Sequence, residues 1–192
     1  MRKLLSGLFL LLTFISFGQM PSVSGQRVNM DSFLKNYDSL SKAREKAAVG
    51  RPFPQFVANN GKETVNNKSL KGKVVLINFW FETCHPCLAE FDALNELYVK
   101  LKDNKDFEFI SFTWDNAEAI KRVKGKFKLL FKVFPITDKE CYRLNQNHGF
   151  PTSLVLNRSG RIAYLVSGGN ADKDKAREFV ITKLLSEVIK EL

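Results

Sequence analysis

Two cysteines separated by a histidine and a proline, Cys84 and Cys87, are the side chains in this chain best suited to chemistry. Such a pair can cycle between a dithiol and a disulfide. It follows the apolar run at residues 74–80, so a buried strand should give way to a helix at the first cysteine. Unpaired N–H groups and the macrodipole at a helix N-terminus stabilise a thiolate, and Pro86 suits a first helical turn. The position of the motif therefore predicts a redox centre.

The same two cysteines could instead supply half of a zinc site. Together with Cys141 and His148 they would make a Cys3His site, and the chain would be a non-catalytic metal-binding module. Cys141 and His148 are seven positions apart, which is beyond the common spacing of zinc fingers. We therefore expect no metal and no cofactor. Cys141 is expected to be a buried apolar thiol, with a second redox role or a ligand role as alternatives.

Length and composition indicate one domain with short appendages, because 192 residues that are 44% hydrophobic can bury one good core. The formal net charge of +10 comes from lysines scattered through the expected helices, with a denser patch at residues 121–132. We interpret this patch as a solvated basic face and expect no nucleic-acid partner. Three cysteines are too few for a disulfide scaffold.

The N-terminus has the pattern of an export signal. Arg2 and Lys3 precede an apolar stretch at residues 4–17, and small residues precede a cut after Gly18. The stretch is shorter than the roughly 20 residues that span a bilayer, so we expect cleavage and no stable membrane insertion afterwards. The predicted organisation is a signal peptide at 1–18, an extension with an amphipathic helix at 19–49, and the main domain at 50–192. Export, with the periplasm as the compartment, would place the cysteines where disulfides persist.

The elements that must position the motif alternate between strand and helix, which predicts an α/β layer architecture built partly on parallel strands. An N-terminal helix is expected up to residue 48, with Asp31 or Ser32 as its cap. An extended segment at 55–57 and small edge strands should follow. The main strands are expected at 74–79, 107–112, 132–136, 153–156 and 162–166, and the helices at 85–102, 116–126, 138–146 (capped by Asp138) and 173–190. A hairpin turn is predicted at residues 157–160.

From about Gly50 to the C-terminus the chain resembles the thioredoxin superfamily, and within it the exported TlpA/ResA-like thiol-disulfide oxidoreductases. The resemblance rests on several motifs in the right order: Gly50-Arg51-Pro52-Phe53-Pro54, residues 70–80, Cys84-His85-Pro86-Cys87, Gly149-Phe150-Pro151-Thr152 and Asn157-Arg158-Ser159-Gly160. It implies a thioredoxin-like fold with a central mixed sheet flanked by helices. The N-terminal helix lies outside the match and would be an addition to that fold.

The resemblance also implies roles for single residues. Cys84 would be the exposed nucleophile and Cys87 the resolving thiol, with Pro151 in the cis form packed against the pair. Phe150 would join Pro151 in binding the substrate. Two neighbours of the cysteines, Trp80 and His85, complete the expected substrate-binding set: Trp80 as a wall and docking surface, and His85 either as an imidazolium that stabilises the Cys84 thiolate or as a spacer.

The expected general base is Glu90. Thioredoxins carry an aspartate six residues before the first cysteine, but Asn78 stands there and cannot accept a proton as a base. Glu90 lies three residues after Cys87 on the expected helix, so the two side chains share a face. Burial beside the thiols would raise its pKa into the working range of a general base. Thr83 is a further departure, because relatives commonly have tryptophan before the first cysteine.

These residues predict an exported thiol-disulfide oxidoreductase that cycles Cys84 and Cys87 to reduce or exchange disulfides in protein substrates. The resemblance implies a membrane thiol carrier as the electron donor and cytochrome c maturation as a process the protein could serve. A non-catalytic adaptor of this fold would usually have lost one cysteine, and both are present.

Overall fold

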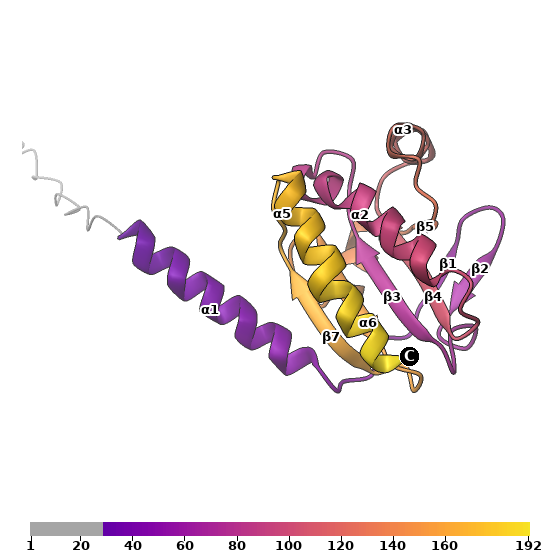
Figure 1. Ribbon diagram of the computed structural model, residues 1–192, viewed down its shortest axis with the longest axis horizontal. Coiled ribbons are helices and arrows are strands. Elements are labelled where there is room, and N and C mark those ends of the chain that lie inside the picture. The colour runs from indigo at the N-terminus through magenta and orange to yellow at the C-terminus, as the bar shows by residue number, and fades with distance from the viewer. Residues whose placement is uncertain (1–28) are drawn as a thin grey trace, which may run out of the picture.

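The computed structural model describes residues 29–192, and its centre is a five-stranded mixed sheet in the order β5-β4-β3-β6-β7 (Figure 1). β4 runs parallel to β3 and β5, whereas β6 runs antiparallel to β3 and β7. The elements are α1 (Met30–Ala48), β1 (Val57–Asn59), β2 (Thr64–Asn66), β3 (Val74–Phe79), α2 (His85–Leu101), β4 (Phe107–Thr113), α3 (Ala117–Phe127), β5 (Lys132–Pro135), α4 (Asp138–Leu144), β6 (Thr152–Leu156), β7 (Ile162–Ser167), α5 (Lys173–Glu178), η1 (Phe179–Leu184) and α6 (Leu185–Glu191). The predicted α/β thioredoxin-like fold is confirmed.

β3 is the central strand because its residues are apolar on both faces, and all six are buried. Val74 and Leu76 pack into a core beneath α2, α3 and the C-terminal helix. Val75, Ile77 and Phe79 point the other way, into a second core closed by α4 and the β1–β2 hairpin. The continuous apolar run that predicted this strand is therefore explained by burial on both sides.

Two helix caps differ from the prediction. α1 is capped by Asn29 rather than by Asp31 or Ser32, because the Asn29 side chain accepts hydrogen bonds from the backbone N–H groups of those two residues at 3.1 and 3.2 Å. α4 is capped by Thr137 rather than by Asp138, with the Thr137 hydroxyl 3.2 Å from the N–H of Glu140. In both cases the capping side chain lies one to three positions earlier than the residue chosen from the sequence.

The hairpins agree with the predicted turn signals. The expected extended segment at 55–57 leads into β1 at Val57, and the N–H of Phe56 bonds to the Asn67 side chain at 2.8 Å instead of to a strand. β1 and β2 then form the expected pair of small strands. At the turn of residues 157–160, the N–H of Gly160 bonds to the Asn157 carbonyl at 2.9 Å, and Gly160 has φ +73°, which favours glycine.

The C-terminal helix is continuous and consists of three successive segments, α5, η1 and α6. It lies beside α2 over one face of the sheet (Figure 1). Its middle part, Phe179–Leu184, is π-helical, which no glycine or proline in the sequence predicts. Such widened turns occur frequently at functional sites.

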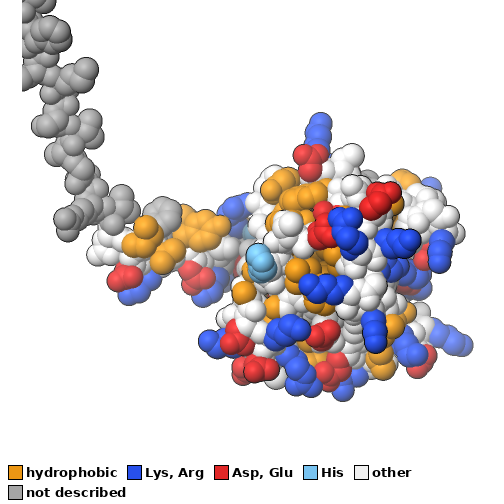
Figure 2. Space-filling model, turned by 90° about the horizontal axis from the view of Figure 1, so that it is seen from above, with side chains coloured by type: hydrophobic (Ala, Val, Ile, Leu, Met, Phe, Trp, Pro, Cys, Tyr) orange, Lys and Arg blue, Asp and Glu red, His pale blue; other side chains and the backbone are white. Residues whose placement is uncertain are grey.

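α1 projects from the domain and is attached mainly to β7 (Figure 1). The Glu45 carboxylate accepts hydrogen bonds from the N–H and hydroxyl of Ser167 at 2.9 and 2.8 Å. The apolar side chains Leu34, Tyr37 and Leu40 of α1 remain exposed, and Figure 2 shows hydrophobic side chains along one side of this helix. No helix between residues 29 and 192 has the length and apolar character needed to cross a bilayer. The predicted signal peptide at 1–18 lies outside the described residues.

Candidate redox site

The two cysteines form a disulfide at the junction between β3 and α2. Their sulfur atoms are 1.98 Å apart. Cys84 is the N-cap of α2, and its sulfur accepts a hydrogen bond from the N–H of Cys87 at 3.3 Å. The predicted strand-to-helix placement is therefore confirmed, with His85 and Pro86 in the first turn. A sulfur held in this way faces unpaired N–H groups, which would stabilise a thiolate after reduction.

Cys84 is less exposed than predicted. Its exposed fraction is 5%, against 1% for Cys87, so it remains the more accessible of the two. It is covered because its side chain, as the N-cap, lies against the first turn of α2. His85, which follows it, is exposed. A substrate sulfur that reacts at this site would meet Cys84 first.

Trp80 forms a wall and not a docking surface, so this part of the prediction is wrong. Its side chain is fully buried. The indole N–H donates to the hydroxyl of Ser111 at 3.1 Å, and the ring packs edge-on against Phe91 at 5.2 Å. Because the last residue of an apolar run can point to either side, the sequence did not reveal this orientation.

Pro151 follows a cis peptide bond with Phe150, as predicted. Pro151 is buried, and its carbonyl accepts a hydrogen bond from the N–H of Gly168 at 2.8 Å. Phe150 is half-buried and lies 5.4 Å from the ring of Phe81, whose carbonyl accepts the N–H of Cys84 at 3.0 Å. Phe150 is thus connected to the cysteine loop through its contact with Phe81.

Glu90 is a buried carboxyl group, with an exposed fraction of only 2%. No hydrogen bond or ion pair to its carboxyl is present among residues 29–192. Burial raises the pKa of Glu90 to about 8, because a carboxylate loses its hydration there. The amide of Asn78, in contrast, donates to the hydroxyl of Ser153 at 3.1 Å and cannot accept a proton as a base. The sequence predicted that the acidic group lies on α2, at Glu90, and not on β3, at position 78. The environments of the two side chains are compatible with that prediction.

Four aromatic side chains form a continuous patch beside the cysteine loop, here called the aromatic rim: Phe81, Trp114, Tyr142 and Phe150. Trp114 stacks on Phe81 at 4.9 Å and meets Phe150 edge-on at 4.6 Å. All four side chains retain some exposure. Trp114 and Tyr142 were not predicted. Trp114 directly follows β4, whose carboxyl end lies beside that of β3, and this parallel pairing is the signal that could have identified it.

The loop between β3 and α2 is held by α3 and the end of β4. Arg122 of α3 makes two hydrogen bonds of 2.7 Å to the carboxylate of Glu82. Their partnership lowers the pKa of Glu82. The N–H of Glu82 also donates to Asp115 at 2.7 Å. Thr83, between this clamp and Cys84, is exposed, so the surface in front of the cysteines differs from one with tryptophan there.

The zinc alternative finds no support. Within residues 29–192 no group of three or more histidine, cysteine or acidic side chains is arranged to hold a metal ion. Cys84 and Cys87 are bonded to each other, and Cys141 is a free, fully buried cysteine, as predicted. Burial raises the pKa of Cys141 to about 12, which keeps it as an unreactive thiol. Burial also lowers the pKa of His148.

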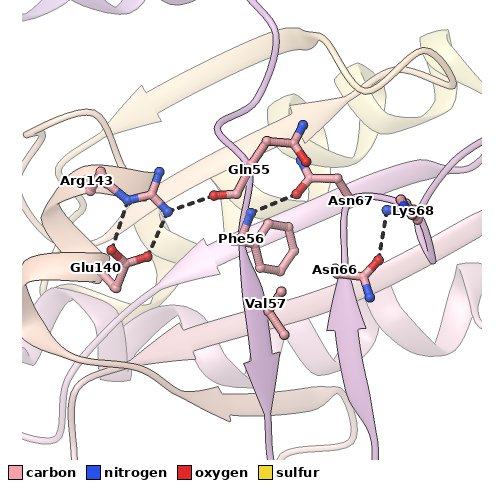
Figure 3. Close-up of a pocket in the computed structure, with 8 residues that line it drawn as sticks. All are labelled: Gln55, Phe56, Val57, Asn66, Asn67, Lys68, Glu140 and Arg143. Carbon is pink, nitrogen blue, oxygen red and sulfur yellow. Dashed lines mark hydrogen bonds and ion pairs between the residues drawn. The ribbon is translucent and has the colours of Figure 1, made fainter.

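A hollow of about 540 Å³ lies elsewhere, between the β1–β2 hairpin and α4 (Figure 3). Arg143 projects into it and is held by Glu140 at 2.7 and 2.9 Å and by the Gln55 carbonyl at 2.8 Å. Asn67 likewise bonds to backbone groups on its far side. None of the predicted site residues lines this hollow, so the redox chemistry is placed at the cysteines and not here.

Residues 48–179 match Redoxin. The chain is 31% identical over 138 residues to the thiol-disulfide oxidoreductase ResA of Bacillus thuringiensis (strain Al Hakam), which covers 69% of this chain and 77% of that relative. It is 27% identical over 135 residues to ResA of Bacillus subtilis (strain 168), which covers 69% of this chain and 74% of that protein.

Two solved structures are similar in fold. The thioredoxin domain of a thiol-disulfide oxidoreductase from Bacteroides vulgatus aligns with 25% identity and a TM-score of 0.57, covering 69% of this chain and 98% of that domain. A protein of Chlorobium tepidum assigned as thiol:disulfide interchange protein DsbE aligns with 24% identity and a TM-score of 0.62, covering 73% of this chain and 97% of that protein.

Proposed function

The chain belongs to the Redoxin family as a thiol-disulfide oxidoreductase of the TlpA/ResA-like type, and from this premise we propose that Cys84 and Cys87 reduce disulfides in exported protein substrates. The observation that supports this most strongly is the disulfide at the start of α2, with a buried carboxyl group one turn further along the same helix. The site thus combines a redox pair with a proton acceptor.

The proposed reaction has two exchange steps. The Cys84 thiolate attacks the substrate disulfide, and one substrate sulfur leaves as a thiolate and takes a proton from solvent. Cys87 then transfers its proton to the Glu90 carboxylate and attacks the Cys84 sulfur. The second substrate sulfur leaves, and the Cys84–Cys87 disulfide remains. Two electrons have passed to the substrate, and an external dithiol must return two electrons to restore the enzyme.

Glu90 suits this role because its buried environment brings the pKa of its carboxyl group close to that of the thiol whose proton it must accept. A carboxyl group with an ordinary pKa would be a weak base toward a buried thiol. Burial raises the pKa of Glu90 to about 8, close to the pKa of a free cysteine. His85, exposed in the first turn of α2, could stabilise the Cys84 thiolate as an imidazolium.

This function is tested by single turnover. The reduced protein is mixed with one equivalent of a disulfide-bonded protein, and free thiols are counted after acid quenching. The expected result is two new thiols on the substrate per enzyme, with Cys84 and Cys87 recovered as a disulfide. Failure to reduce any of several unrelated protein disulfides would contradict the proposal.

The aromatic rim is the proposed docking surface for the substrate chain. Trp114 contributes the central ring, since it contacts Phe81, Tyr142 and Phe150. Aromatic rings with partial exposure are typical anchors for apolar segments of a partner.

Replacing Trp114 by Ala should raise KM for a protein disulfide about five- to tenfold while leaving the reaction with a small disulfide such as oxidised glutathione within about twofold. The difference arises because a small disulfide does not reach the rim. Tyr37→Ala, at an exposed aromatic on α1, is the matched control. An equal loss with both substrates would indicate damage to the cysteines instead of lost docking.

We further propose that residues 1–18 are a cleaved signal peptide and that the mature domain, from residue 50, acts in the periplasm with a membrane thiol carrier as its electron donor. The apolar stretch at residues 4–17 and the basic start support this. The resemblance based on the sequence motifs makes cytochrome c maturation the process we favour. N-terminal sequencing of the exported protein should begin at Gln19, and a retained Met1 would contradict cleavage.

A further inference from the structure

The loop between β7 and α5 passes unusually close to two residues of the site. A Cβ added at Gly169 would stand 2.7 Å from Cγ of Pro151 and 2.8 Å from Oε1 of Glu90. At every other described glycine, an added Cβ would meet nothing within 4 Å. Gly169 also lacks the positive φ that explains its neighbour Gly168, at +82°. Its small size is therefore needed for close approach and not for an unusual backbone conformation.

Glu90 also lines a hollow of about 300 Å³ on this side of the molecule. The hollow is bounded by the loop residues Gly168, Gly169 and Asn170 and by Lys175 of α5, all of which are exposed. None of the residues of the aromatic rim lines it. The buried carboxyl group thus has a second, solvent-facing side that is distinct from the surface proposed to hold the substrate.

We propose, on the basis of the proposed function, that Gly169 is a positioning residue for Glu90 and that the hollow beside it is the route by which Glu90 returns its proton to solvent. During the second exchange step the substrate is bound covalently to Cys84 and covers the cysteine surface. The proton that Cys87 gives to Glu90 needs another exit. The hollow at Asn170 and Lys175 provides one, because it remains open when the substrate face is occupied.

The contacts around Gly169 also indicate which neighbouring group would move if a side chain were added at this position. Contacts of 2.7 and 2.8 Å are shorter than a real Cβ tolerates, so one neighbour must shift. The Pro151 ring is rigid and its carbonyl is tied to Gly168. The Glu90 side chain has rotatable bonds and no hydrogen bond within the described residues to hold it. A methyl group at position 169 should therefore displace the carboxyl group without removing it.

The main test compares Gly169→Ala with Gly125→Ala, a glycine in α3 with open space around it. Each of the two exchange steps is timed by rapid mixing across pH, and far-UV circular dichroism confirms folding. In Gly169→Ala the second step should slow about tenfold or more and its pH midpoint should shift, while the first step stays within about twofold of the parent. Gly125→Ala should match the parent in both steps. An unshifted midpoint in a folded Gly169→Ala protein would overturn the positioning role.

A second variant keeps the test decisive if Gly169→Ala does not fold. In Glu90→Ala the hollow would extend toward the thiol, and added formate should restore the second step at least about fivefold in a concentration-dependent way. Absence of rescue in a folded protein would overturn the proton route. If Glu90→Gln itself leaves the second step unchanged, the proposed base fails. If Glu90→Gln slows that step but Gly169→Ala and formate have no effect, only the present inference fails.

Discussion

Replacing Cys87 by Ser is expected to stop turnover after the first exchange and to leave the substrate covalently attached to Cys84. The Cys84 thiolate can still attack, because the N-terminus of α2 that stabilises it is unchanged. The mixed disulfide then persists, since serine cannot attack the Cys84 sulfur as a thiolate does. Steady-state reduction should fall by at least about 10³-fold. Non-reducing mass spectrometry should show an adduct that dithiothreitol releases.

Two further variants make this result specific. Cys84→Ser should lose turnover to a similar extent but form no adduct. Cys141→Ala should keep full turnover, because the Cys141 thiol is fully buried and its pKa is raised to about 12. An adduct that forms through Cys87 in Cys84→Ser, or a loss of turnover in Cys141→Ala, would contradict the assigned roles.

Replacing Glu90 by Gln is the second change with a large expected effect. The amide keeps the shape of the side chain but cannot accept the Cys87 proton. The second exchange step should slow about 10²-fold at neutral pH, within the range of general-base contributions. Its rate in the parent should rise with pH as Glu90 loses its proton near pH 8. That dependence should be missing in Glu90→Gln and present in Asp92→Asn, an exposed carboxyl group on the same helix.

The same substitution has a predicted effect on stability, with a definite sign. The pKa of Glu90 is about 8 in the folded protein and near 4.5 when unfolded, so the folded state binds the extra proton between those pH values. The free energy of unfolding therefore falls as pH rises from about 4.5 to 8. Glu90→Gln removes this loss, and its stability relative to the parent should increase by roughly 4 kcal/mol between pH 5 and 9. The cost of burying the unpaired amide is the same at every pH and cancels in this comparison. A constant difference across that range in urea unfolding would contradict a buried, titrating Glu90.

Some elements could be predicted because local chemistry decides them. Residues 74–79 are all apolar except Asn78, and a central strand buried on both faces requires such a predominantly apolar pattern. The disulfide motif and Pro86 define the start of α2 in the same local way. The turn at residues 157–160 is fixed by an asparagine and a glycine whose geometry few other residues can adopt.

Other features depend on contacts between distant segments and left no local signal. Trp80 and Trp114 follow adjacent strands, yet one is fully buried and the other joins the surface. That outcome depends on Ser111 and Phe91 for the first and on Phe81 and Phe150 for the second.

Gly169 is a similar case, since its need for a small side chain arises only when the last loop of the sheet meets α2 and the Pro151 loop. The π-helical turn at Phe179–Leu184 belongs to the same class. Helix caps lie between the two classes: the side chains at 29 and 137 have the right chemistry, but so do their neighbours.

The central claim, that Cys84 and Cys87 form a reducing dithiol, is tested most directly by the reduction potential of this pair. The full mature protein is equilibrated in glutathione or dithiothreitol buffers of graded potential, and the thiols are trapped by alkylation and counted by mass. We predict a single two-electron transition confined to Cys84 and Cys87, near the roughly −270 mV of thioredoxin. A potential near −120 mV, typical of strongly oxidising relatives of the fold, would contradict a reductant.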